Sequence, residues 1–331
     1  MANPSKLKQV SEFRPRGILF CIAQSARDDC VYVGSSDFGV YEVDLSQKKI
    51  EPKLVGKHES YVTGIALAGK MLVSGSYNQR LIWWDVEKRA QARKVEAHQK
   101  WIRNVVASPD GKVIASVADD MVCRVWDAES GKKIHELRGH KEDTPNNYKS
   151  MLYAVTISSD SKYLATGDKV GHVVIWDLKT GKQLKTVESP GMYTWDPRQR
   201  RHSIGGIRSL AFSADNKMLA VGGIGKIGNI DHLGGPSRTE VFDWQTGKTL
   251  ALFENGSHKG LIQHLEFDPN GEWLLGAGGA NNGFYLFYNV KSKKTVLSEK
   301  VPMHVHDLMM RPEQQQVVMV GHQRGVIYEM K

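Results

Sequence analysis

One pattern recurs seven times along this chain, and it constrains the fold more than any other feature. In six copies an alternating apolar run ends in an aromatic or apolar residue followed by Asp or Asn, and a turn with charged residues comes next. Three strong copies end in Trp-Asp, at Asp85, Asp127 and Asp177. Four weaker copies, in which Val, Phe, Tyr or Glu replaces Trp, end at Asp44, Asp243, Asn289 and Met330. Such repetition indicates an array of similar structural units.

The spacing of the copies indicates the kind of unit. Successive copies are separated by 41, 42, 50, 66, 46 and 41 residues, close to the roughly 40–45 residues of a four-stranded propeller blade. Within the third unit, strands are predicted at 102–107, 113–117, 122–126 and 133–137, with Asp110-Gly111 and Ser130-Gly131 in the turns. Each unit therefore indicates one blade of four antiparallel strands.

The Trp-Asp ends, the Gly139-His140 pair and the Ser-Pro-Asp-Gly turn at 108–111 resemble the WD40-repeat family over nearly the whole chain. The resemblance implies an all-β fold, a seven-bladed β-propeller that residues 1–331 form as a single, stand-alone domain. It is most specific for units two to four, which keep the Trp. The other units keep the strand pattern with a different residue at that position.

The two ends of the chain complement each other. The last unit stops after its third strand, whereas residues 6–14 precede the first strand of unit one. A ring left open at this place would expose two strand edges. We therefore expect residues 6–14 to supply the fourth strand of blade seven and to close the ring, as in similar members of the family.

The resemblance also implies buried hydrogen-bond networks that join a His before the first strand, a Ser or Thr in the second, an Asp in the following turn and the Trp. The matching residues are His58, Ser74, Asn78 and Trp84 in unit two, His98, Ser116, Asp120 and Trp126 in unit three, and His140, Thr166 and Trp176 in unit four. Unit four has Val170 at the Asp position, so an incomplete network is expected there. A buried polar chain costs stability unless every member has a partner, and we interpret these residues as structural.

Composition excludes several classes of protein. With 40% hydrophobic and 24% charged residues the chain is not disordered, and its apolar runs are far shorter than the roughly 20 residues of a membrane-spanning helix. Its start lacks the apolar segment of a secretory signal. Cys21, Cys30 and Cys123 form no Cys-x-x-Cys pair, which favours free, buried thiols in a reducing compartment. We expect a cytoplasmic protein without membrane insertion.

Three insertions depart from the repeat. They lie at 141–149, before the first strand of blade four, and at 190–206 and 224–238, before the first strand of blade five and between its strands two and three. Strands reverse direction at each hairpin, so these two kinds of connection emerge on the same face of a propeller. Long connections in a compact domain are usually functional or disordered, and these contain too many large residues for flexible filler.

The residue types in the insertions favour a binding surface. Tyr, Trp and Arg dominate the hot spots of protein interfaces, and the segment 190–206 combines two aromatic residues with three arginines. The predicted partner-binding residues are Tyr148, Tyr193, Trp195, Arg198, Arg201, His232 and Arg238. The predicted function is a non-catalytic scaffold that docks a protein or peptide partner on this face. The alternative is that the insertions only pack on one another around a small satellite core.

The positive charge of the turns between strands three and four leaves another function open. The turns between strands three and four carry twelve Lys and Arg residues against Glu87 and Glu129, a surplus of +10 compared with +9 for the whole chain. These residues are Lys48, Lys49, Lys88, Arg89, Lys132, Lys133, Lys179, Lys182, Lys248, Lys291, Lys293 and Lys294. This lysine rim is a hypothetical site for nucleic acid or another polyanion. No aromatic residues interleave with the lysines, which favours plain solvated turns.

No catalytic residue, cofactor site or metal site is predicted. The spacing Gly223-Ile-Gly225-Lys-Ile-Gly228 matches a dinucleotide fingerprint, but a turn-rich loop follows where the pyrophosphate needs a helix. His304-Val-His306 places two imidazoles on one side of a strand, with no third ligand at a diagnostic spacing. The remaining alternative is a small-ligand-binding or enzymatic propeller that uses the Gly-rich loop and nearby His and Asp residues.

Overall fold

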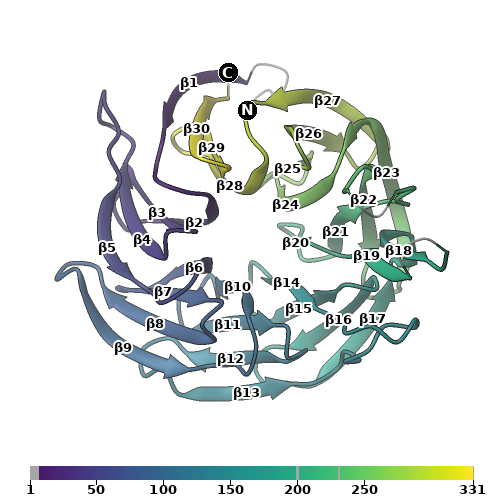
Figure 1. Ribbon diagram of the computed structural model, residues 1–331, viewed down its shortest axis with the longest axis horizontal. Coiled ribbons are helices and arrows are strands. Elements are labelled where there is room, and N and C mark those ends of the chain that lie inside the picture. The colour runs from purple at the N-terminus through teal and green to yellow at the C-terminus, as the bar shows by residue number, and fades with distance from the viewer. Residues whose placement is uncertain (1–6, 199–200, 230–231, 331) are drawn as a thin grey trace. The chain divides into compact units, whose positions relative to one another are not determined.

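A computed structural model describes residues 7–198, 201–229 and 232–330. The expected segments at 6–14, 190–206 and 224–238 include Lys6, Gln199, Arg200, Ile230 and Asp231, which lie outside the described residues. The fold is the predicted all-β, seven-bladed propeller, with seven four-stranded antiparallel sheets and one additional two-stranded sheet. Within a blade, consecutive strands are neighbours (Figure 1).

The first three blades follow one another along the chain. Blade one consists of β2 (Leu19–Gln24), β3 (Cys30–Ser35), β4 (Gly39–Asp44) and β5 (Lys53–Lys57). Blade two consists of β6 (Val62–Ala68), β7 (Met71–Ser76), β8 (Arg80–Asp85) and β9 (Ala90–Glu96). Blade three consists of β10 (Ile102–Ala107), β11 (Val113–Ala118), β12 (Cys123–Asp127) and β13 (Lys133–Leu137).

The insertions belong to blades four and five, and blade six follows them. Blade four consists of β14 (Leu152–Ile157), β15 (Tyr163–Asp168), β16 (His172–Asp177) and β17 (Gln183–Glu188). A 3-10 turn, η2 (Pro190–Met192), and the hairpin β18 (Tyr193–Asp196) and β19 (His202–Gly205) follow. Blade five consists of β20 (Ser209–Phe212), β21 (Met218–Ile224), β22 (Pro236–Asp243) and β23 (Lys248–Lys259). Blade six consists of β24 (Leu261–Phe267), β25 (Leu274–Gly279), β26 (Gly283–Asn289) and β27 (Lys294–Val301).

Blade seven is built from both ends of the chain. Its strands are β28 (Val305–Arg311), β29 (Gln316–Gly321), β30 (Arg324–Glu329) and β1 (Lys8–Phe13). In Figure 1 the purple β1 lies beside the yellow β30, and the two strands pair antiparallel from Lys8↔Glu329 to Phe13↔Gly325. The predicted closure of the ring by the N-terminal strand is therefore confirmed.

The chain divides into two compact units. One contains residues 1–116, 124–134 and 305–331, and the other contains residues 117–123 and 135–304. Each has its own apolar clusters, since the inner strands of a blade are buried on both faces. Val33, Val43 and Ile327 belong to a cluster of the first unit, and Val173, Leu219 and Phe242 to one of the second. That residues 1–331 form a single domain stays a prediction.

The strand pattern was predicted closely. The four strands expected in the third unit differ from β10 to β13 by no more than one residue at either end. The reason is local, because strand ends coincide with the Asp-Gly and Ser-Gly turns and with positive φ angles at Gly111 and Gly131. Cys21, Cys30 and Cys123 are buried, as expected, and take part in no disulfide. Among the described residues, no helix is long and apolar enough to span a membrane.

Candidate functional site

The insertion 190–206 is an ordered hairpin in its described part. Strands β18 and β19 pair antiparallel from Tyr193↔Gly205 to Asp196↔His202. Gly205 and Gly206 have φ angles of 103° and 104°. A Cβ on Gly206 would lie 2.6 Å from the backbone of Lys169, so the hairpin returns to blade five by a route that only glycine permits.

The insertion 141–149 packs against this hairpin. It closes on itself through Thr144, whose amide donates to the Tyr148 carbonyl (2.7 Å) and whose hydroxyl accepts from the Tyr148 amide (3.2 Å). The Tyr148 ring lies 5.4 Å from the Trp195 ring and 5.2 Å from that of His202. The Tyr193 hydroxyl donates to Asn146 Oδ1 (3.0 Å). The two insertions therefore form one aromatic cluster.

The insertion 224–238 joins the same cluster. The Ile227 amide donates to the Thr194 hydroxyl (3.0 Å). Ile224 and Ile227 are buried with Leu261, and Ile204 and Leu233 pack on them. Part of this insertion extends strands β21 and β22, which remain paired as far as Ile224↔Ser237. The satellite core of the alternative interpretation is thus present between the insertions 190–206 and 224–238, and the insertion 141–149 is attached to them through the ring contacts of Tyr148.

Six of the seven predicted binding residues have side chains that are at least partly exposed in the insertions, and the structure brings Tyr148 and Trp195 into contact. Tyr148, Tyr193 and Trp195 are half-buried, and Arg198, Arg201 and His232 are exposed. Arg238 is instead held inside blade five, where its guanidinium contacts Glu240 Oε1 (2.8 Å) and Glu254 Oε2 (2.5 Å). We call Tyr148, Tyr193, Trp195, Arg198, Arg201 and His232 the insertion surface.

Sequence reasoning missed a second group of exposed rings, in the first unit. Phe38, Tyr61 and Trp101 are 38%, 41% and 50% exposed. Tyr77 lies 5.7 Å from Tyr61 and stacks on Trp101 at 4.6 Å, and the Arg103 guanidinium lies 5.0 Å from the Tyr77 ring centre. We call these five residues the aromatic row. Its signal in the sequence was an aromatic residue directly before β6 and β10 and another in the turns after β3 and β7.

The networks predicted in blades two and three are built around their serines. Ser74 Oγ lies 2.7 Å from His58 Nε2 and accepts from Trp84 Nε1 at 2.7 Å. Ser116 Oγ lies 2.8 Å from His98 Nε2 and accepts from Trp126 Nε1 at 3.0 Å.

In both networks the Asn or Asp side chain of the turn accepts a hydrogen bond from a backbone amide. Asn78 Oδ1 accepts from the Arg80 amide (3.3 Å), and Asp120 Oδ1 accepts from the Val122 amide (3.3 Å). His98 Nδ1 lies 2.6 Å from Arg124 Nη1, so Arg124 donates to this ring. The sequence pattern had not identified Arg124. Burial lowers the pKa of His58 from 6.5 to about 4, so its ring is neutral at pH 7.

The network of blade four is complete, which corrects the expectation drawn from Val170. His140 Nε2 lies 2.8 Å from Thr166 Oγ1, which also accepts from Trp176 Nε1 (3.1 Å). His140 Nδ1 lies 2.9 Å from Asp168 Oδ2. The carboxylate thus comes from the end of β15, two residues before the position that the repeat pattern assigns to it.

Comparison with known proteins agrees with this architecture. The family model described as "WD domain, G-beta repeat" matches residues 90–127 and 131–177. Both segments end in the Trp-Asp pairs whose indoles donate into the networks above. This chain therefore contains WD40 repeats in residues 90–127 and 131–177.

The relatives of this WD40-repeat protein are distant. U3 small nucleolar RNA-interacting protein 2 of Homo sapiens is 34% identical over 113 residues, which cover 33% of this chain and 24% of that protein. Nuclear distribution protein PAC1 of Coccidioides posadasii (strain C735) is 30% identical over 173 residues, 48% of this chain and 34% of that protein. The chain therefore spans about a quarter to a third of the length of these curated relatives.

The lysine rim of the WD40-repeat protein consists of twelve exposed side chains. Nine lie in the turns between third and fourth strands, and Lys133, Lys248 and Lys294 begin the fourth strands β13, β23 and β27. Several are paired: Lys88 with Asp85 (3.1 Å), Arg89 with Glu42 (2.7 Å) and Lys49 with Glu51 (2.5 Å). Such exposed pairs contribute little to stability, but they reduce the free positive charge. The Gly-rich segment at 223–228 includes the end of β21 and continues as an irregular loop through residue 229.

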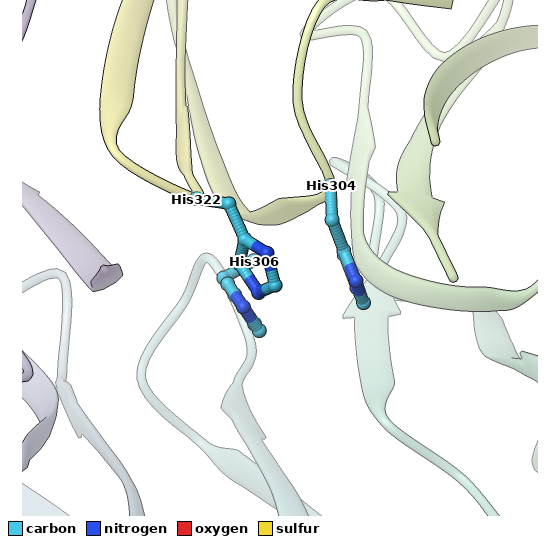
Figure 2. A group of neighbouring side chains, drawn as sticks. All are labelled: His304, His306 and His322. Atoms are coloured by element: carbon cyan, nitrogen blue, oxygen red, sulfur yellow. The ribbon is translucent and has the colours of Figure 1, made fainter. Parts of the chain in front are cut away.

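One group of histidines in the described part of the chain has the arrangement of metal ligands. His304 and His306, noted in the sequence, are joined by His322, which the sequence did not connect with them. Figure 2 shows the His306 and His322 rings next to each other and the His304 ring to one side. Burial lowers the pKa of His322 below 6.5.

Proposed function

We propose that this WD40-repeat protein is a non-catalytic scaffold that docks a protein partner on the insertion surface. The observation that supports this most is the union of three separate insertions into one ordered cluster. Loops that served only as connections would not need a shared apolar core and a common aromatic contact. The cluster instead presents half-exposed rings beside exposed arginines, the residue types of interface hot spots.

The chemistry of the surface favours a partner that carries an acidic segment. Arg198 and Arg201 are exposed, and a guanidinium binds a carboxylate through two parallel hydrogen bonds. The Trp195 ring lies on the same hairpin and is already held by Tyr148 at 5.4 Å. A ring fixed in this way loses little conformational entropy when a partner covers it.

Two further considerations bear on the proposal. One relative is named for an interaction with small nucleolar RNA, which favours the lysine rim as a second candidate site, for RNA. The chain also holds three buried cysteines that take part in no disulfide, and we propose a cytoplasmic location on that basis. Fractionation of cells that express the tagged chain, with enrichment outside the cytoplasm as the contrary result, tests the location.

Quantitative affinity capture with matched variants tests the function. Partners captured by the wild-type chain are identified and their binding measured for Trp195→Ala and for Arg198→Ala/Arg201→Ala. Each variant should weaken binding by about 1–4 kcal/mol, because it removes a hot-spot contact. The control variant neutralises Lys132, Lys133, Lys293 and Lys294 on the lysine rim and should bind the partner with unchanged affinity.

The outcomes separate the surfaces. Full binding by both insertion variants, together with loss in Trp101→Ala, would move docking to the aromatic row. Loss only in the lysine variant, with retention of the wild type on heparin and a steep salt dependence, would promote the polyanion function. Equal melting temperatures of all variants are required before the comparison is made.

A further inference from the structure

We propose that His304, His306 and His322 bind one divalent transition metal ion of the zinc class. Each residue offers an imidazole nitrogen, and the three nitrogens lie within 4.8 Å of one another. Figure 2 shows the rings gathered at the start of β28 and at the turn that follows β29.

The strand register explains why residues this far apart in the sequence meet. Val305 of β28 pairs with Gly321 of β29. His304 precedes the first of these residues and His322 follows the second, so both lie at the same end of the antiparallel pair. His304 is also joined to His306 by only two peptide bonds, and the chain itself keeps it beside that residue.

Local backbone irregularities aim the other two rings. The register of β28 and β29 shifts between Val305 and Asp307, and this bulge re-aims the side chain of His306. His322 and Gln323 form the two-residue turn between β29 and β30, in which Gln323 has a φ of 59°. Such tight turns hold their residues in defined positions.

The neighbours of the histidines suit a preorganised site. The His306 ring packs edge-on against Phe20 at 5.1 Å and lies 5.0 Å from the His322 ring. His304 Nε2 lies 3.3 Å from the side-chain amide of Gln263. With the Gln263 amide oxygen turned toward it, this nitrogen donates to Gln263 and Nδ1 is left to bind the metal, as outer-shell partners of ligating histidines arrange. Both oxygens of the neighbouring Asp307 carboxylate accept from backbone amides, of Ile22 (2.9 Å) and of Leu308 (2.9 Å), and the group of neighbouring ligand atoms consists of three imidazoles.

The ligand set selects the class of metal. Three imidazoles suit Zn²⁺, Ni²⁺ and Cu²⁺, whereas Mg²⁺ and Ca²⁺ require oxygen ligands. In a tetrahedral site with Zn–N bonds of about 2.1 Å, the ligand nitrogens lie about 3.4 Å apart. Side-chain rotations that move the imidazole nitrogens by about an ångström would bring them to this separation. Three protein ligands leave a fourth position for water.

Metal titration of the full chain, prepared without a histidine tag and freed of metal with a chelator, tests the site. Calorimetry with Zn²⁺ should give one ion per chain, and binding should raise the melting temperature because the metal binds only the folded state. Co²⁺ should give the visible absorption of a tetrahedral nitrogen-ligated ion. Mg²⁺ should give neither signal.

Variants distinguish this site from adventitious binding by the other histidines. His322→Gln, in an exposed turn, should keep the apo melting temperature and weaken Zn²⁺ binding at least about tenfold. His306→Gln should do the same. The control His232→Gln, at an exposed histidine of the insertion surface, should bind Zn²⁺ like the wild type. Absence of stoichiometric binding in the wild type, or undiminished binding and an unchanged Co²⁺ spectrum in H306Q/H322Q, would overturn the assignment.

Discussion

The carboxylate of Asp168 lies 2.9 Å from Nδ1 of His140, and both side chains are only 2% exposed. The other carboxylate oxygen accepts from the backbone amides of Val170 and His172, each at 3.0 Å. Asp168 therefore performs two tasks, since it orients the His140 ring toward Thr166 and ties down the turn after β15. An Asp at position 170 is not needed because the residue at 168 already reaches the ring.

The first prediction concerns this pair. Asp168→Ala leaves His140 Nδ1 and two backbone amides without their acceptor, so the free energy of unfolding should fall by about 1–3 kcal/mol. Urea unfolding followed by tryptophan fluorescence measures the change. Asp143→Ala is the control, because Asp143 is exposed and only pairs with Lys149 (2.9 Å), and it should cost less than about 0.5 kcal/mol. Equal stability of the two variants would contradict the role of Asp168.

The second prediction is a pH dependence that arises from His58. Its pKa is about 4 in the folded protein, because of burial, and 6.5 in the unfolded chain. Between these pH values the unfolded state binds a proton that the folded state does not, so folding stability falls as the pH is lowered. The loss should reach roughly 3 kcal/mol from pH 7 to pH 4. In His58→Gln this part of the slope should disappear, whereas in His232→Gln it should remain.

The third prediction concerns the closing strand. Phe13 of β1 is 2% exposed and pairs with Gly325 of β30. Phe13→Ala should lower the free energy of unfolding by roughly 3–5 kcal/mol, and deletion of residues 1–14 should lower the melting temperature because it leaves the edge of β30 unpaired. Val10→Ala, at a site 43% exposed on the same strand, should change little. An unchanged melting curve of the truncated chain would refute closure as a source of stability.

The fourth prediction separates structure from docking at a tryptophan. Trp126 Nε1 donates to Ser116 Oγ at 3.0 Å, and Trp126→Phe removes this donor while it keeps an aromatic ring. Stability in urea should fall by about 1–3 kcal/mol, and affinity for the captured partner should not change. If stability were retained and capture lost, Trp126 would belong to a binding surface and not to a structural network.

Local features of the sequence determined the repeating part of this protein. Strand ends, turns, the Trp-Asp positions, the closing segment and the places of the three insertions all follow from patterns only a few residues long, repeated at a period of about one blade. Even the His58–Ser74–Trp84 network could be read in this way, because its members occupy fixed positions in the repeat.

Tertiary structure alone decided which residues outside the repeat pattern come into contact. The histidines at 304, 306 and 322 converge because the register places Val305 opposite Gly321, and no spacing rule encodes that pairing. The aromatic row forms because turns of successive blades place Tyr61, Tyr77 and Trp101 in contact. Asp168 replaces the expected acid because its side chain reaches the same nitrogen from another position. Repeats fix backbone geometry through local hydrogen bonding, whereas side-chain contacts between loops depend on packing that the chain acquires only when it folds.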